Sequence, residues 1–354
     1  MYRHVIIEQG SYVYHKDNQL YVRGDGSEHK IPIEDIATVL LASPQITITS
    51  RALDALVTAG TDVIVCDNKY SPCGTLLPFA SHSRRLKVLK LQIEQTRPRL
   101  KRLWQQIVRQ KIRNQGLCLQ YAGKEDCVSH LASKVTSGDT DNVEGYAASL
   151  YFKDLFGEDF IRRDDTVING VLNYGYAILR SSIARFLAVY GFEPALGIFH
   201  HSELNNFNLA DDLIEPFRPV VDLWAATECL DAAEFSVAMR HDLVRLLNCH
   251  IMSGEEKHVM NYAIERSVQS LSASYADKEN ALLLPSLLSI YVRICNSYEA
   301  VEKHRIRLVQ NLPHTGSVRV LVITERQFAM MEVLCGEKLA DIDTKYGDDT
   351  LTIL

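Results

Sequence analysis

The sequence lacks most features of secreted, metal-stapled or membrane-spanning proteins. Its eight cysteines include no Cys-X-X-Cys pair, so we expect reduced, mostly buried thiols rather than a structural zinc site or a disulfide framework. The longest apolar run, residues 281–292, is too short to cross a bilayer and contains Pro285. The first ten residues alternate charged and apolar side chains, without the apolar stretch of a signal peptide. These absences predict a soluble, intracellular protein with no membrane partner.

The composition is that of a folded globular protein. Hydrophobic residues make up 47% and charged residues 23% of the 354 residues, which excludes wholesale disorder. The length predicts two domains with room for an appendage. The net charge of −6 excludes a chain that is basic throughout, such as a nucleic-acid coat protein. No internal repeat or low-complexity segment is present.

Residues 1–80 have the pattern of short strands separated by turns. Six segments rich in β-branched and aromatic residues lie close together, with turn signals at residues 16–18 and 24–26. This spacing favours a small β-sandwich or a curled sheet. One helix interrupts it over residues 51–60, with Ser50 as its cap and Gly60 at its end, and residues 61–67 are typical of a buried strand.

The pattern changes twice after this domain. From about Ser81 to Leu284 helical periodicity dominates. Beyond Pro285 a strand, a helix and a strand follow, an order that matches half of a small ferredoxin-like domain. We therefore predict an α+β fold with three parts: an N-terminal β-sandwich-like domain (1–80), a mainly α-helical domain (81–285) and a partial ferredoxin-like tail (286–354).

Basic side chains are concentrated in residues 84–113. This stretch has eleven lysines and arginines and one acid, Glu94, which gives a local charge of +10. Surface helices usually mix charge signs because like charges repel, so a polyanion such as nucleic acid would relieve the repulsion. The alternative is a solvated face balanced by acids elsewhere, and Trp104 is expected in the core. The basic residues are Arg84, Arg85, Lys87, Lys90, Arg97, Arg99, Lys101, Arg102, Arg109, Lys111 and Arg113.

Glu144 lies near the start of a predicted helix. Asp139 or Asp141 can cap this helix, and apolar residues follow the glutamate at helical spacing, at positions 148, 151, 152 and 155. A charge at the head of an apolar stripe is costly unless it is paired or bound to a metal ion. An acid in the first turn is also stabilised by the helix dipole at a partly exposed end. From this segment alone both interpretations stay open.

A second acidic group follows two adjacent histidines. Asp212 and Glu215 are three residues apart in a helix predicted to begin at residue 209, with residue 208 as its cap, so their carboxylates face the same side. Like charges side by side repel, and a divalent cation is a common remedy. His200 and His201 lie upstream in a loop that can fold back onto this turn, although a structural role for either histidine stays open. The prolines at positions 216 and 219 should kink or split the helix.

These residues together form a mixed set of nitrogen and oxygen ligands. Glu144, one histidine and Glu215 suit Mg²⁺ or Mn²⁺ at a phosphodiester. If both histidines bind, the set also matches the 2-His-1-carboxylate sites of non-haem iron oxygenases. The basic stretch favours phosphate chemistry over the iron site.

Several segments, in order, resemble one family. Residues 3–23 and 31–49 are similar to its N-terminal β-domain, and residues 76–92 and 103–115 to the entry of its helical domain. VEGYAASLYF (143–152) and residues 168–222 are similar to its catalytic region. The family is Cas one (Cas1), the integrase of CRISPR adaptation, of the type II kind, and the resemblance covers about residues 1–285.

The resemblance implies a metal-binding and catalytic triad at matching motif positions. Glu144 stands in VEGYAAS, His200 in GIFH and Glu215 in DDLIEPFR. Asp212, one turn before the last acid, is placed to assist, and His201 is the neighbouring alternative to His200. The segment INGVLNYGY (168–176) corresponds to a structural signature, in which we expect packing and hydrogen bonding rather than chemistry.

The resemblance also implies the partners and the reaction. Family members form homodimers through the N-terminal domain, and two dimers flank a dimer of Cas two (Cas2) in a heterohexamer on double-stranded DNA. The 3′-hydroxyl of a captured fragment attacks a phosphodiester at the border of a CRISPR repeat, in a metal-dependent transesterification. The basic stretch would hold DNA backbone rather than read bases. A cytoplasmic, prokaryotic protein is expected, and its partners extend to the type II effector nuclease during acquisition.

The tail resembles the second half of Cas2. Residues 289–337 correspond to that half, whereas the first strand and helix of Cas2 have no counterpart. A natural fusion would be expected to carry the whole partner, so the half points to a deletion across two reading frames or to an artificial chain. Half a ferredoxin-like sheet cannot fully bury its helix, and strand exchange with a second copy could complete it.

Two other functions remain compatible with the sequence. One is a metal-dependent nuclease that cuts branched DNA without integrating it. The other is a catalytically silent DNA-binding scaffold of the adaptation complex. An iron oxygenase is disfavoured because such a site is usually built on a β-barrel.

Overall fold

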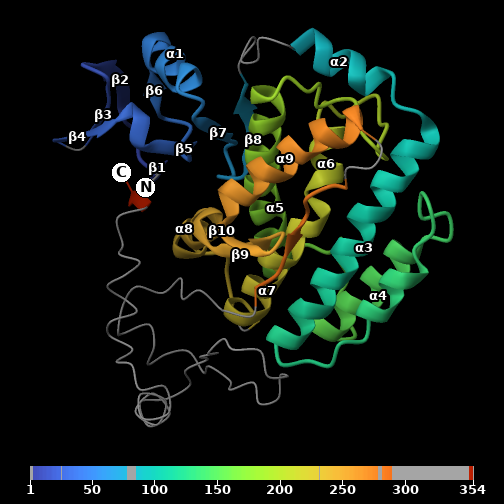
Figure 1. Cartoon of the computed structure of the whole chain (residues 1–354). Helices are drawn as coiled ribbons and strands as arrows, with labels where there is room; N and C mark the ends of the chain where they lie inside the picture. Colours follow the sequence, from blue (N-terminus) through green and yellow to red (C-terminus); the bar gives the residue numbers. More distant parts are fainter. Residues whose placement is uncertain are drawn as a thin grey trace, which may run out of the picture.

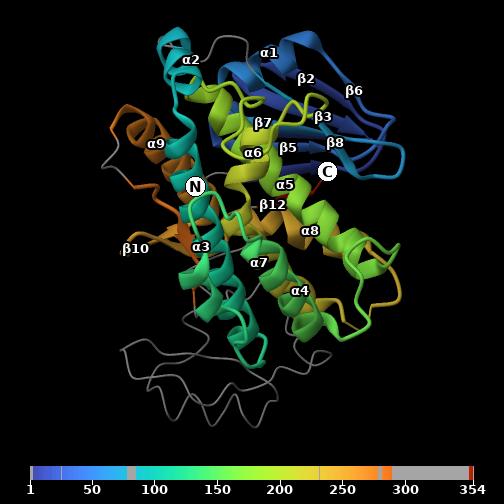
Figure 2. The same ribbon diagram turned by 90° about the vertical axis from the view of Figure 1, so that its right-hand side faces the viewer.

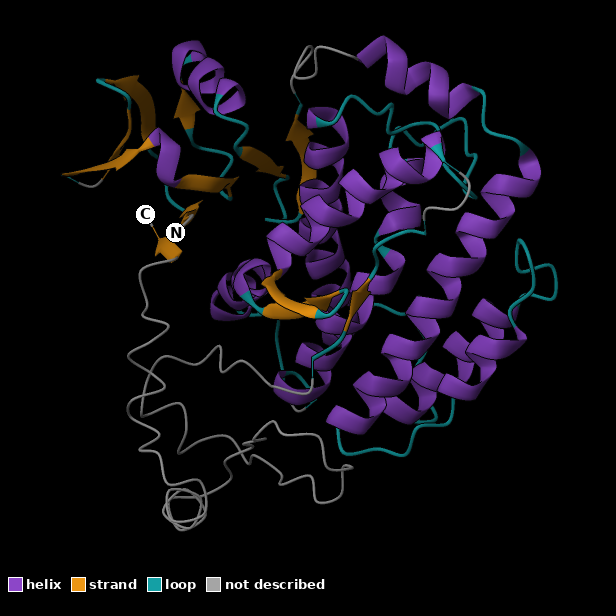
Figure 3. Cartoon of the chain, viewed as in Figure 1, coloured by secondary structure: helices purple, strands orange, loops and turns teal. Residues whose placement is uncertain are grey.

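The computed structural model describes residues 3–24, 26–77, 85–230, 232–277, 281–288 and 351–353. Within these ranges the fold is α+β, with strands gathered in the N-terminal part and helices forming the larger body (Figure 3). The N-terminal part is drawn in blue beside the helical body in Figure 1, which also shows the last described strand close to the first.

The N-terminal part consists of two sheets and one helix. Short β-branched segments form most of these strands, as predicted, and α1 interrupts them where a helix was expected; strand β8 was not predicted. The elements are β1 (Arg3–Ile7), β2 (Tyr12–Lys16), β3 (Gln19–Gly24), β4 (Ser27–Pro32), β5 (Ile36–Leu41), β6 (Thr47–Ile48), α1 (Ser50–Thr58), β7 (Asp62–Cys66) and β8 (Pro72–Leu76).

The two sheets differ in strand direction. One has the order β12-β1-β5-β7-β8, in which β12, β1, β5 and β7 pair in parallel and β8 is antiparallel. The other has the order β4-β3-β2-β6, with β4, β3 and β2 antiparallel and β6 parallel to β2. Val5, Val13, Leu20, Val39 and Leu56 belong to one buried cluster, so the two sheets and α1 share a core.

The cap of α1 differs from the prediction by one residue. Thr49 rather than Ser50 is the N-cap, and its Oγ1 accepts a hydrogen bond from the Ala52 amide at 3.2 Å. Either residue type can cap a helix, so the local sequence did not distinguish them.

Helices dominate the second part, and short strands interrupt them. The elements are α2 (Arg85–Ile93), α3 (Arg97–Tyr121), α4 (Val143–Phe156), α5 (Val167–Val189), α6 (Asn208–Leu213), α7 (Arg218–Glu228), α8 (Val237–Arg245), β9 (His250–Ser253), β10 (Glu256–Val259), α9 (Met260–Ala276), β11 (Pro285–Ser286) and β12 (Leu351–Ile353). The hairpin of β9 and β10, which β11 extends, was not predicted. Its signal in the sequence is Gly254, which has φ +69° at the turn.

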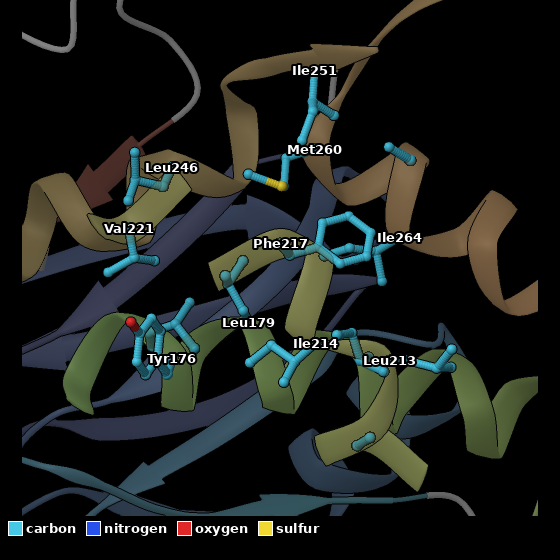
Figure 4. Packing of buried hydrophobic residues seen from close by; sticks show 14 of the residues in the cluster. Tyr176, Leu179, Leu213, Ile214, Phe217, Val221, Leu246, Ile251, Met260 and Ile264 are labelled. Carbon is cyan, nitrogen blue, oxygen red and sulfur yellow. The ribbon is translucent and has the colours of Figure 1, made fainter. Parts of the chain in front are cut away.

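A continuous hydrophobic core surrounds α5. Figure 4 shows Leu179 of α5 near Ile214 and Phe217, with Met260 and Ile264 on the other side of the phenylalanine. Helix α5 is buried along most of its length, and α3 covers the outer side of the helical body in the rotated view (Figure 2). These helices form the rigid frame on which the site is built.

Polar contacts fix the N-terminal part to this frame. Ser181 Oγ of α5 donates to Asp62 Oδ1 at 2.9 Å, and Arg185 Nη1 donates to the Gly60 carbonyl at 2.7 Å. His4 is fully buried, its Nε2 lies 3.0 Å from Asn248 Oδ1, and burial lowers its pKa to about 4.

One buried side chain, Asn114 of α3, connects three distant segments. Its Nδ2 donates to the carbonyl of Pro216 at 2.6 Å and to that of Pro285 at 3.0 Å. Its Oδ1 accepts from the Leu287 amide at 3.2 Å. The segment that follows residue 284 is therefore hydrogen-bonded to the middle of α3.

The predicted tail falls mainly outside the described residues. Of residues 286–354 the structure describes 286–288 and β12, which pairs in parallel with β1. The predicted β-α-β order over residues 289–337 lies outside them. No helix among the described residues is both long and apolar enough to span a membrane.

Candidate active site

Helix α3 directs one residue of the predicted basic surface, Lys111, toward the protein interior. Leu103, Trp104, Ile107 and Val108 form its buried face. Lys111 follows Ile107 by four residues, so it lies on the same face. Its side chain is only 12% exposed, which corrects the prediction that it belongs to an exposed DNA-binding surface.

Lys111 lies between the two predicted catalytic glutamates. Its Nζ is 2.6 Å from Glu144 Oε1, to which it donates a hydrogen bond, and 2.5 Å from Glu215 Oε2. The three residues come from α3, from α4 and from the 3₁₀ turn Glu215–Phe217. Since both oxygens lie within 2.6 Å of one nitrogen, they are about 5 Å apart at most.

The start of α4 positions Glu144. The Asp139 carboxylate accepts hydrogen bonds from the amides of Val143 and Glu144, both at 3.0 Å, so it satisfies the first free N–H groups of the helix. This confirms Asp139 as the capping acid, although the residue at the N-cap itself is Asn142. Glu144 thus lies in the first turn of α4 with its amide bonded to Asp139 and its side chain directed to Lys111.

A break between two helices positions Glu215. The helix splits into α6, a 3₁₀ turn and α7, as the two prolines predicted. Arg218 Nε donates to Glu215 Oε1 at 2.9 Å, and the Arg218 guanidinium lies 4.4 Å from the centroid of the Tyr176 ring. Glu215 is therefore held by two cations, one on each of its oxygens.

The charges of this cluster stabilise one another. Burial alone would lower the pKa of Lys111, but Glu215 and Glu144 outweigh it and raise that pKa. Burial alone would raise the pKa of Glu215, but Arg218 and Lys111 lower it to about 2. Lys111 and Glu215 are thus both charged at neutral pH.

Asp212 organises the loop that carries His200. Its buried carboxylate accepts hydrogen bonds from the amides of Ile198 (2.5 Å), Phe199 (3.0 Å) and His200 (3.2 Å), and from His200 Nδ1 at 2.7 Å. The hydrogen bond to Asp212 raises the pKa of His200. Because Nδ1 carries the donated proton, Nε2 of the neutral ring is left with the lone pair that a metal ion requires.

An aromatic pair supports the same histidine. Trp104 is buried, which confirms its predicted place in the core. It stacks on Phe199 with ring centroids 4.3 Å apart, and His200 meets its edge at 5.8 Å. The imidazole is therefore fixed from two sides while 43% of it stays exposed.

A buried network behind Arg218 was not predicted. Asp222 accepts hydrogen bonds from the hydroxyls of Tyr151, at 2.9 Å, and Tyr176, and burial raises its pKa to about 6. Tyr176 also lies under the Arg218 guanidinium, so the network reaches Glu215 through one arginine. An acid at position 222 carries no local sequence signal, whereas Arg218 could have been found from its spacing of three residues from Glu215.

The other predicted site residues are distributed as follows. His201 is exposed. Arg109 is half-buried and donates to the Val135 carbonyl at 2.9 Å. Arg85, which pairs with Glu193 at 3.4 Å, is exposed, as are Lys87, Lys90, Lys101, Arg102 and Arg113, whereas Arg84 lies outside the described residues.

The structure does not bring the three residues of the predicted triad together around one point. Among the residues that the structure describes, no three His, Cys, Asp or Glu side chains form a group that could hold a metal ion. The ammonium of Lys111 stands between Glu144 and Glu215, and Nδ1 of His200 is bonded to Asp212. The triad as a ligand set therefore stays a prediction.

Comparison with known proteins gives one family. The profile described as "CRISPR associated protein Cas1" matches residues 4–232. A protein named CRISPR-associated endonuclease Cas1 from Neisseria meningitidis serogroup C (strain 8013) is 42% identical over 297 residues, which is 82% of this chain and 97% of the relative. A CRISPR-associated endoribonuclease Cas2 from Acidovorax ebreus (strain TPSY) is 56% identical over 48 residues of the C-terminal region, 14% of this chain and 47% of that protein.

Solved structures share the fold. A casposase bound to integration product superposes with a TM-score of 0.67 at 19% identity, over 86% of this chain and 98% of that one. A chain of a Cas6-RT-Cas1–Cas2 complex gives 0.61 at 20% identity, over 80% of this chain and 36% of that one. At these identities the likeness supports the fold alone.

Proposed function

Because the chain belongs to the Cas1 family of CRISPR-associated proteins, we propose that it joins captured DNA fragments into the CRISPR repeat array by metal-dependent transesterification. As a Cas1 protein it is an integrase and endonuclease of CRISPR adaptation. The ligands, the metal dependence and the DNA contacts of this chain are the parts that we propose from its own residues.

One observation carries the proposed site. Glu144 and Glu215 are 71 positions apart in the sequence, yet both place a carboxylate oxygen within 2.6 Å of one cationic nitrogen. His200 interacts electrostatically with this cluster. The charge of Glu215 contributes to raising the pKa of His200, and the charge of His200 contributes to lowering the pKa of Glu215. The protein thus builds a cation position between two acids, with an imidazole nearby.

The donor set fits Mg²⁺ or Mn²⁺. Glu215 Oε2 is buried and has no hydrogen-bond partner, although Lys111 lies close enough for a charge contact. A buried oxygen with an unsatisfied lone pair is suited to a metal ion. Glu144, His200 and Glu215 would hold the ion, and a bound divalent ion polarises a phosphoryl oxygen and lowers the pKa of the attacking 3′-hydroxyl.

Two further residues of the site, Asp212 and Arg218, orient the proposed ligands. Asp212 fixes the ring orientation of His200 and leaves Nε2 available. Arg218 holds one oxygen of Glu215 at 2.9 Å, which directs the other oxygen to the cation position. The 3′-hydroxyl displaces the bridging oxygen directly, so no nucleophilic side chain takes part.

The exposed basic residues of α2 and of the first turns of α3 are our proposed DNA-backbone contacts. Lys87, Lys90, Lys101 and Arg102 are exposed there, and neutralising phosphates releases counterions. We propose that two homodimers of this chain flank a Cas2 dimer in a heterohexamer on double-stranded DNA, with the type II effector nuclease joining during acquisition. The prokaryotic cytoplasm, where the array lies, is the proposed place of action.

The C-terminal region is proposed to act as an incomplete Cas2. The matched Cas2 relative is covered over 47% of its length, which supports the proposal that the tail corresponds to about half of that protein. We propose that a second copy completes this half by strand exchange. Measuring the size of the complex with and without a full-length Cas2 tests whether the tail leaves docking intact.

The test of the proposed function is joining of a labelled DNA fragment into a repeat-bearing plasmid with Mg²⁺ or Mn²⁺. Glu144→Ala should reduce joining at least about 100-fold, because it removes a metal ligand and so a major part of the transition-state stabilisation. Asp141→Ala is the matched control, since it removes an exposed acid just before the same helix. Undiminished joining by Glu144→Ala would defeat the assignment.

Analysis of the products separates the alternative functions. An integrase yields plasmid with covalently joined label, whereas a branched-DNA nuclease yields cut DNA without joined label. A silent scaffold binds the DNA and yields neither product, with or without Mn²⁺. Glu144→Ala should keep its DNA affinity, which distinguishes loss of chemistry from loss of fold.

A further inference from the structure

We propose that the Lys111 ammonium is a resident cation, which holds Glu144 and Glu215 together in the metal-free protein and leaves its position when a divalent ion binds. This inference rests on the metal site of the proposed function. It assigns to Lys111 a positioning role that goes beyond the three ligands.

The first argument is the shared position. Nζ lies 2.6 Å from Glu144 Oε1 and 2.5 Å from Glu215 Oε2. Carboxylate oxygens lie about 2.0–2.6 Å from bound Mg²⁺ or Ca²⁺, so an ion held by these two oxygens would occupy nearly the same point as the nitrogen. The ammonium and the ion therefore compete for one volume.

The second argument is the small number of partners around Glu215 Oε2. Nζ donates a hydrogen bond to Glu144 Oε1, whereas Glu215 Oε2, 2.5 Å from Nζ, has this one cationic contact and no further partner. A spherical ion has no directional donors, so it can satisfy both oxygens at once. Both oxygens can therefore accept a metal ion at the position that Nζ occupies.

The third argument is charge. Arg218 already neutralises Glu215 from its other oxygen, so Lys111, Arg218 and a divalent ion together would place four positive charges on two carboxylates. Like charges at ligand distance repel, and Lys111 is the cation with a flexible four-carbon stem. Arg218 is less free to move, because it also lies over the Tyr176 ring.

The fourth argument is the route of departure. Glu144 is 20% exposed and His200 43%, so this side of the cluster is open to solvent. Asn114, one turn further along α3, is fully buried and holds the helix backbone in place. Metal binding therefore requires only the lysine side chain to turn toward the open side.

The direct test is acylation of lysines in the full-length protein, followed by mass spectrometry, with and without saturating Mn²⁺. Lys111 should be protected in the metal-free protein and should react roughly ten-fold faster with Mn²⁺, because its ammonium leaves the two carboxylates and its side chain turns toward solvent. Lys87 and Lys101 are exposed internal controls whose rates should not change. In Glu144→Gln the rate at Lys111 should no longer respond to Mn²⁺.

A second measurement uses Lys111→Gln with Arg113→Gln as its control, an exposed cation two residues along the same helix. By titration calorimetry, Lys111→Gln should bind Mn²⁺ about ten-fold more tightly than the wild type, since no internal cation competes. Its metal-free melting temperature should fall, and Mn²⁺ should restore it. Lys111→Arg, which keeps the charge, should bind Mn²⁺ no more tightly than the wild type.

The outcomes separate the two levels of the proposal. If wild-type protein binds Mn²⁺ while Lys111 stays protected, the resident-cation inference is overturned and the metal site stands. If wild-type protein takes up no Mn²⁺, both are overturned. Should Lys111→Gln fail to fold, acylation of the wild type still decides the question.

Discussion

Similar basic residues have different environments in the two halves of the basic segment, residues 84–113. In the outer half, α2 and the first turns of α3, Lys87, Lys90, Lys101 and Arg102 are exposed. In the inner half, Lys111 lies between two carboxylates and Arg109 is bonded to a backbone carbonyl. One run of positive charge in the sequence thus becomes a solvent-facing surface at one end and part of an internal charge cluster at the other.

The difference shows that local charge density does not fix electrostatic role. What decides is whether the helix face that carries a cation also carries the apolar stripe. Lys111 continues the stripe of Trp104 and Ile107, whereas Lys101 and Arg102 point away from it. The inner half should therefore govern stability and metal chemistry, and the outer half should govern affinity for DNA.

Removing Glu215, the carboxylate that pairs with Lys111 of the inner half, should have the largest effect on stability. Glu215→Ala leaves Lys111 and Arg218 buried without a shared partner, which should lower the free energy of unfolding by about 3–5 kcal/mol. Urea unfolding in the presence of a chelator measures this. Lys101→Gln, in the outer half, should change it by less than about 0.5 kcal/mol. A loss below about 1 kcal/mol for Glu215→Ala would mean that the inner cluster is not electrostatically coupled.

Lowering the pH should reduce the stabilisation that comes from Glu215 and Lys111, and it should not affect the exposed basic residues of the outer half. The pKa of Glu215 is lowered from 4.5 to about 2, so the unfolded chain binds its proton first as the pH falls. The contribution of Glu215 is therefore complete above pH 4.5 and is lost between pH 4.5 and about 2, up to about 3 kcal/mol. Unfolding of the wild type and of Glu215→Gln across this range measures the difference. Parallel curves for the two proteins would contradict the prediction.

Changes in the outer half should have the smallest energetic effect and a distinct salt signature. The double variant Lys101→Gln/Arg102→Gln should bind duplex DNA about ten-fold more weakly at ~0.1 M salt, with a log–log salt slope shallower by about 2. Arg109→Gln, in the inner half, should leave the slope unchanged, because its guanidinium is bonded to Val135. Fluorescence anisotropy over a salt series measures both. An equal slope change in the two variants would remove the distinction between the halves.

The fold was predictable where local signals agree with packing. Short β-branched runs identified the N-terminal strands, and Pro216 and Pro219 correctly predicted a split helix. The hairpin around Gly254 was missed because its strands are short and partly polar, and pairing with β11 rather than local propensity stabilises them.

The ligand set stays a prediction, and the structure shows part of its arrangement. Motif positions predict Glu144, His200 and Glu215 as ligands, and the structure brings the two glutamates close to one nitrogen. Lys111 was assigned to the surface because charge density was weighed above helical spacing, although its place four residues after Ile107 already indicated an inward direction. The contact between Arg218 and Tyr176 needs tertiary structure, since these residues lie on different helices.

Asn114 gives the site a mechanical connection to whatever follows residue 287. It fastens Pro285 and Leu287 to α3 by two hydrogen bonds, and it makes a third to Pro216, the residue after Glu215. Tension on the chain beyond Leu287 would therefore be transmitted to the helix break beside Glu215 and to the turn of α3 that carries Lys111. A partner that pulls on the tail would thus act on the backbone beside Glu215 without touching its carboxylate.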